Sequence, residues 1–192
     1  SLFGEPEKAF LALMIFVLGL FVAAYGILAA LRVRAEEEEQ HVDALLSTTT
    51  TRSSLIGSHV VFSVAGTALI ALTIGLGITL GKGLTGGLSG SDWDILSAAL
   101  YKLPAIWITG GIVVLLIGLI PKSSAAISWS VFALFIGLQL LWEMGILPET
   151  AFLLSPFGHV YPSKPQTALT FVILTVLALV LYTIGFMGFK RR

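Results

Sequence analysis

Residues 9–31, AFLALMIFVLGLFVAAYGILAAL, form an apolar run without a single charged side chain. A helix rises about 1.5 Å per residue, so about 20 such residues cross the roughly 30 Å hydrocarbon core of a bilayer. This stretch is therefore long enough to span a membrane. The whole chain has the same character, since 56% of its 192 residues are hydrophobic and only 11% are charged. We predict an all-α membrane protein.

Four further stretches are long and apolar enough to cross the membrane. We predict a single transmembrane domain over residues 1–192, with spans at about 9–34, 55–80, 95–120, 125–147 and 167–189. Glycines within these spans are expected to let helices pack closely. They are Gly66, Gly75, Gly77, Gly110, Gly111 and Gly118. Prolines surround the apolar stretch 151–154 before the last span, which predicts short re-entrant helices enclosed by protein.

The distribution of basic residues predicts the orientation of the spans. Loops on one side hold seven Lys and Arg residues, and those on the other hold four, with Lys102 among them. Because basic loops stay in the cytoplasm, we expect residues 35–52, the Pro121-Lys122 turn and the C-terminus to be cytoplasmic and Ser1 to be outside. The expected location is a bacterial plasma membrane. The chain begins without Met or a signal peptide, and we expect it to be the C-terminal part of a longer protein.

The composition argues against several kinds of function. Lys plus Arg and Asp plus Glu both number 11, so no basic excess favours a nucleic-acid partner. The chain has no cysteine, and its three histidines lack metal-ligand spacing, so we predict no metal site. No grouping of nucleophile, base and acid is visible, so we predict that the chain is not an enzyme, has no catalytic residue and holds no cofactor itself.

Two titratable residues inside the predicted spans are candidates for a substrate contact or a proton relay. Glu143 is the one carboxylate within a predicted span, about a turn from its outer end, and a buried charge at such depth usually serves a function. Its alternative role is an interfacial side chain that reaches water beside Trp142. His59 lies about a turn into the second span and is either a relay or a packing residue.

A polar segment, AEEEEQHVDALLSTTTTR at residues 35–52, separates the first two spans. The glutamates favour an extension of the first helix into water. A short second helix is predicted at about residues 41–48, where Val42, Leu45 and Leu46 share one apolar face. The face is too small to anchor in lipid, so we expect it to dock in a groove of a partner protein.

The same segment resembles the cytoplasmic loop of type 2 ABC exporter permeases. The matching residues are Glu36, Glu37, Glu38, Leu45, Leu46, Ser47, Thr48 and Arg52. Further matches follow in order along the chain: the LPA at 103–105 with Trp107, the Pro121-Lys122 turn, and the LSPF at 154–157 with His159. Within the family, the chain looks most like the branch of polyketide antibiotic exporters, such as tetronasin-type systems. Thr49 departs from the pattern, since the family commonly has proline there.

The resemblance implies that the five spans are helices two to six of a six-helix permease unit. The short helix would be the coupling helix, which contacts an ATP-binding cassette subunit. Its implied contact residues are Glu37, Glu38, His41, Val42, Leu45, Leu46, Thr48 and Arg52. Two copies of that subunit would bind ATP and Mg, and a second permease half, fused or separate, would complete the transporter.

The implied activity is export of a hydrophobic or amphipathic compound, such as an antibiotic, a drug or a lipid-like molecule, by a permease that is surrounded by membrane lipid. Two alternatives remain open. One is a proton-coupled secondary transporter that uses Glu143 and His59, and the other is a membrane subunit that only scaffolds a complex.

Overall fold

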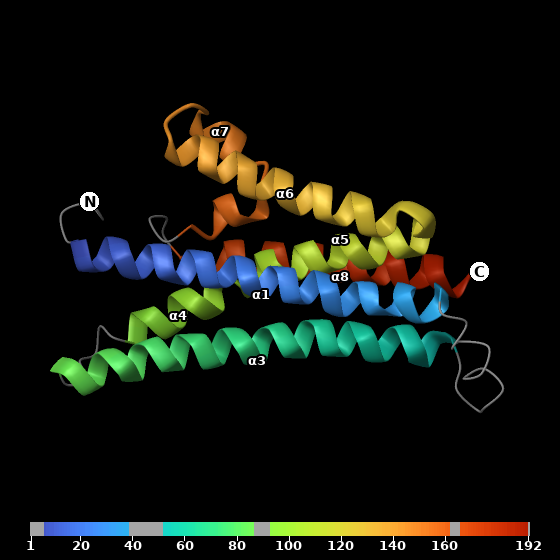
Figure 1. The fold of residues 1–192 in the computed structure, drawn as a ribbon, viewed down its shortest axis with the longest axis horizontal. Coiled ribbons are helices and arrows are strands. Elements are labelled where there is room, and N and C mark those ends of the chain that lie inside the picture. Colours follow the sequence, from blue (N-terminus) through green and yellow to red (C-terminus); the bar gives the residue numbers. More distant parts are fainter. Residues whose placement is uncertain (1–5, 39–51, 87–92, 162–165, 192) are drawn as a thin grey trace.

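A computed structural model describes residues 6–38, 52–86, 93–161 and 166–191, and these ranges contain helices and no strand (Figure 1). The five long helices are α1 (Pro6–Glu38), α3 (Arg52–Gly86), α5 (Leu103–Leu119), α6 (Ser124–Glu143) and α8 (Ala168–Lys190). The short helices are α4 (Trp93–Tyr101), η3 (Pro121–Ser123), α7 (Glu149–Phe152) and η4 (Pro156–His159). The predicted fold class is therefore confirmed.

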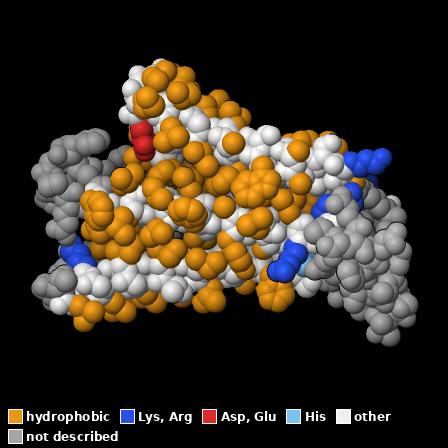
Figure 2. Space-filling model, in the orientation of Figure 1, with side chains coloured by type: hydrophobic (Ala, Val, Ile, Leu, Met, Phe, Trp, Pro, Cys, Tyr) orange, Lys and Arg blue, Asp and Glu red, His pale blue; other side chains and the backbone are white. Residues whose placement is uncertain are grey.

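Five segments of the described chain are long and apolar enough to cross a membrane. They are Leu13–Arg34, Gly57–Leu84, Trp93–Leu119, Pro121–Glu143 and Ala168–Lys190. Their helices run lengthwise through the molecule (Figure 1). We call the end near α7 the α7 end, and the end where α8 finishes the C-terminal end. On the face shown in Figure 2, apolar side chains cover the middle, and most of the Lys and Arg side chains lie near the C-terminal end.

The third span lies at the centre of the bundle. Within its apolar stretch of 18 residues, 72% is buried, whereas the corresponding share is 22% for the spans on α3, α6 and α8. Its helix α5 is flanked by α1, α3, α6 and α8 and has no charged residue along its 17 residues. A helix that is apolar on all sides is suited to this central position.

Glycine contacts let α5 and α8 cross at short range. A methyl group on Gly118 would collide with the carbonyl oxygen of Gly185, and one on Gly185 would collide with the backbone of Val114. Of the six glycines predicted to allow close packing, five face another helix in this way, and Gly77 has open space. The prediction is thus confirmed except at Gly77. Such close backbone approach gives dispersion contacts, which hold helices together where lipid removes the hydrophobic drive.

Buried polar side chains join α3 to its neighbours at mid-span. The Ser63 hydroxyl donates a hydrogen bond of 3.0 Å to the Gly26 carbonyl of α1. The Trp107 indole of α5 donates to the Thr67 hydroxyl at 3.2 Å. Interhelical hydrogen bonds of this kind contribute on average about 0.6 kcal/mol each in membrane proteins. They fix the register of α3 against α1 and α5.

The end of α6 is set by glycine and proline. Gly145 has a φ of 73° and follows a helix terminus where the Ile146 amide donates back to the Leu141 carbonyl at 2.9 Å. A glycine in the left-handed region stops a helix without the steric cost of a Cβ. Pro148 then prevents the helix from resuming.

The chain next folds back between α6 and the rest of the bundle. Phe152 of α7 is fully buried, and Phe157 of η4 is 4% exposed. Helix η4 contacts both α5 and α6. The short helices predicted before the last span are therefore present; η4 is mostly buried, whereas Glu149 and Thr150 of α7 are exposed.

Candidate functional site

A groove of about 700 Å³ lies between α1 and α3, in the half of the bundle nearer the C-terminal end. Its lining residues are Tyr25, Leu28, Ala29, Leu31, Arg32, His59 and Phe62. On α1 the lining positions recur at three and four residues and so share one face of the helix. The groove opens at the side of the bundle, because Leu28 and Phe62 are 57% and 67% exposed. We call it the α1–α3 groove.

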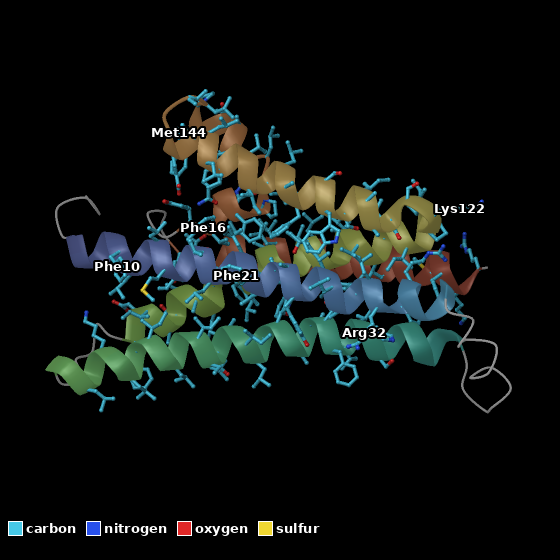
Figure 3. All side chains as sticks on the ribbon, viewed as in Figure 1. Phe10, Phe16, Phe21, Arg32, Lys122 and Met144 are labelled. Atoms are coloured by element: carbon cyan, nitrogen blue, oxygen red, sulfur yellow. The ribbon has the colours of Figure 1, made fainter. Side chains whose placement is uncertain are left out.

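The α1–α3 groove combines an apolar wall with basic groups. Arg32 is exposed and lies beside α3 (Figure 3), and His59 is half-buried on the opposite wall. His59 could be singled out from the sequence, but nothing in the sequence indicates that Arg32 lines the same groove. Among the described residues that line the groove, none is acidic. The site is therefore fitted to a ligand with an apolar body and an acidic or polar head.

A second polar site surrounds Glu143 near the α7 end. The Gln139 amide donates a hydrogen bond of 3.0 Å to Glu143 Oε1, and the Tyr161 hydroxyl donates to the same oxygen at 3.1 Å. Glu143 itself is exposed and is the last residue of α6. Partial burial, together with the negative charge of Glu143 and its hydrogen bond, raises the pKa of Tyr161 to about 12. Tyr161 therefore remains a hydrogen-bond donor throughout the physiological pH range.

Aromatic rings enclose Tyr161 and fix its position. The centroid of its ring lies 5.1 Å from that of Trp142 and 5.7 Å from that of Phe152, both edge-on, and 6.3 Å from that of Phe16 of α1. Trp142 and Phe152 stack at 4.6 Å. Edge-on and stacked pairs at these distances each contribute about 0.5–1.5 kcal/mol beyond area burial. The Glu143 site is therefore held by packing as well as by hydrogen bonds.

Lys102 was counted among the loop residues when the orientation of the spans was predicted, and the structure corrects this. It lies between α4 and α5, inside the third span, and is only 3% exposed. Its ammonium is 4.9 Å from the centroid of the Phe16 ring, and its stem passes Gly19 of α1. The carboxylate of Glu143 acts on it electrostatically. The ring and the carboxylate offset part of the cost of burying this charge.

The predicted coupling residues are described only in part. Glu37 and Glu38 end α1, and Arg52 begins α3. His41, Val42, Leu45, Leu46 and Thr48 lie outside the described residues, so the docking face stays a prediction. The two described ends do fix one relationship: the helices that flank the segment are α1 and α3, which also form the walls of the α1–α3 groove. Among the described residues, no group of three or more His, Cys, Asp or Glu could hold a metal ion.

A buried central span, four surrounding spans and a lateral amphipathic groove define a multi-pass membrane domain. Residues 3–190 match the family described as "Multidrug efflux system permease Rv1217c, C-terminal domain", and the chain belongs to this family. It is 32% identical over 192 residues to the multidrug efflux system permease protein Rv1217c of Mycobacterium tuberculosis strain H37Rv. That match covers 98% of this chain and 35% of the relative, so the chain spans about a third of the relative's length.

Proposed function

We propose that this chain is the membrane-spanning C-terminal domain of an efflux permease that exports a hydrophobic or amphipathic compound across the bacterial plasma membrane. The observation that carries the proposal is the family match over nearly the whole chain. A relative that is 32% identical is named a multidrug efflux permease protein. The five apolar spans among the described residues agree with a domain that lies within a membrane.

Energy for export would come from a separate ATP-binding cassette subunit. Two copies of that subunit would bind ATP and Mg, and one would dock on Val42, Leu45 and Leu46 in the cytoplasm. The extension of α1 through Glu38 favours this arrangement, because a continuous helix of 33 residues can carry a displacement into the membrane. Segment 39–51 joins α1 to α3, so a push on it would shift both helices. The tetronasin-type branch, with a second permease half that completes the path, is the form of exporter we favour.

A proton-coupled transporter is the competing function, and the surroundings of Glu143 bear on it. Gln139 and Tyr161 both donate hydrogen bonds to one of its oxygens, so the carboxylate links its own helix to the segment that follows η4. We therefore assign Glu143 a role in holding α6 to the segment that follows η4.

The full-length permease, co-purified with its ATPase and reconstituted in proteoliposomes, tests the proposal. Efflux of a lipophilic dye should require ATP and continue when a protonophore collapses the proton gradient. Dye movement that follows the proton gradient without ATP would contradict it in favour of the secondary transporter. An associated ATPase whose rate no lipophilic compound alters would favour the scaffold alternative.

A further inference from the structure

We infer that the α1–α3 groove is a binding site for an anionic phospholipid, whose phosphate lies against Arg32 and whose acyl chain lies along Leu28 and Phe62. The inference does not depend on ATP coupling or on the identity of the exported compound. It rests on the depth, the charge and the openness of the groove.

The depth of the groove matches that of lipid headgroups. Span Leu13–Arg34 has 22 residues, which at about 1.5 Å per residue equals the thickness of the hydrocarbon core. Arg32 lies two residues from its end, and His59 lies two residues inside the start of span Gly57–Leu84. Both basic groups are therefore at the boundary where lipid phosphates are found.

The chemistry of the groove selects an acidic amphiphile. A guanidinium can donate two parallel hydrogen bonds to a phosphate, and His59 is a second polar side chain at the same corner of the groove. Leu28 and Phe62 extend from this polar corner toward the middle of the bilayer, along which an acyl chain would run. The volume of about 700 Å³ lies within the range of about 300–1,000 Å³ that is usual for small-molecule sites.

The groove is also open at the side of the described bundle. Its wall residue Phe62 is 67% exposed, and its neighbour Val61 is 62% exposed on the same helix. Both belong to a span of which 22% is buried, so most of α3 faces outward. A phospholipid could therefore enter laterally, without any opening of the bundle.

The test uses the full-length permease in nanodiscs of phosphatidylcholine alone or of an equal mixture with phosphatidylglycerol, and native mass spectrometry counts the retained lipids. We expect wild-type protein to retain phosphatidylglycerol preferentially. Arg32→Gln should reduce that preference about tenfold, the factor that a hydrogen bond between charged groups in a defined site contributes. Lys122→Gln is the matched control: it removes an exposed cation near the same end of the bundle but outside the groove, and should leave the preference unchanged. Equal preference in wild type and Arg32→Gln would overturn the inference.

A second measurement keeps the inference testable if Arg32→Gln does not fold. A photo-crosslinking phenylalanine analogue at position 62, in an otherwise unchanged protein, should give an adduct with phosphatidylglycerol. A cross-link to another segment of the permease or to a second copy would show that protein fills the groove and would overturn the inference. So would failure of the lipid adduct to form when the exported dye is present during irradiation, which would make the groove a substrate site.

Discussion

The Tyr161 hydroxyl donates a hydrogen bond to the Glu143 carboxylate across 3.1 Å, and this contact joins the segment after η4 to the end of α6. The two residues are 18 positions apart in sequence. Between them the chain turns at Gly145, passes through α7 and η4, and returns beside Trp142. The Glu143 site therefore closes a loop that fills the space between α6 and the central bundle.

Glu143→Gln should leave transport intact, because an amide oxygen can still accept the Tyr161 hydrogen bond, but should lower the free energy of unfolding by about 1 kcal/mol or more, because the buried Lys102 loses a compensating charge. Glu143→Ala should lower the melting temperature, since the Gln139 and Tyr161 donors both lose their acceptor. ATP-driven dye efflux and thermal unfolding of the full-length permease check both. Loss of efflux in Glu143→Gln at an unchanged melting temperature would instead support a proton relay.

Lys102→Met should stabilise the protein by about 1 kcal/mol or more, because methionine fills the place of the lysine stem without a buried ammonium. Thermal unfolding in detergent measures the effect, and Lys122→Met at an exposed site should stay within about 0.5 kcal/mol of wild type. If Lys102→Met is markedly less stable than wild type, the contacts with Phe16 and Glu143 outweigh the cost of burying the charge.

Gly118→Ala should destabilise the bundle by about 1–3 kcal/mol, since the added methyl group would collide with the Gly185 carbonyl and force α5 from α8. Gly137→Ala is the matched control on α6, where a methyl group meets no described atom within 4 Å. It should be neutral or stabilising by up to about 1 kcal/mol, the helix-propensity difference between the two residues. Equal melting temperatures for the two variants would contradict the packing of α5 on α8.

The spans could be predicted because apolar length is written along the sequence itself. The expected second span, 55–80, corresponds to Gly57–Leu84, and the expected last span, 167–189, to Ala168–Lys190. The predicted end of the fourth span, residue 147, lies beyond the observed end of α6 at Glu143. The apolar run continues to residue 147, but the left-handed Gly145 ends the helix earlier.

Long-range contacts could not be predicted in the same way. Lys102 follows α4 directly and precedes Pro104, so it looked like a loop residue, but α1 brings Phe16 and Gly19 against it from far along the chain. Gln139 could have been paired with Glu143 from its spacing of four residues on a helix, whereas Tyr161 could not. The sequence could not show that Arg32 and His59 line the same groove, because this depends on the register of α3 against α1.

The central claim is that an ATPase drives this permease through the segment between α1 and α3. The most direct measurement is the ATP hydrolysis rate of the full-length permease with its co-purified ATPase in nanodiscs, with and without a lipophilic substrate. Leu45→Asp and Leu46→Asp should abolish the substrate-stimulated part of the rate by placing a charge in the predicted docking face. Ala44→Asp introduces the same charge on the opposite side of the predicted helix and should retain stimulation. Stimulation that survives both leucine substitutions, or a purified complex that contains no ATPase, would contradict the account.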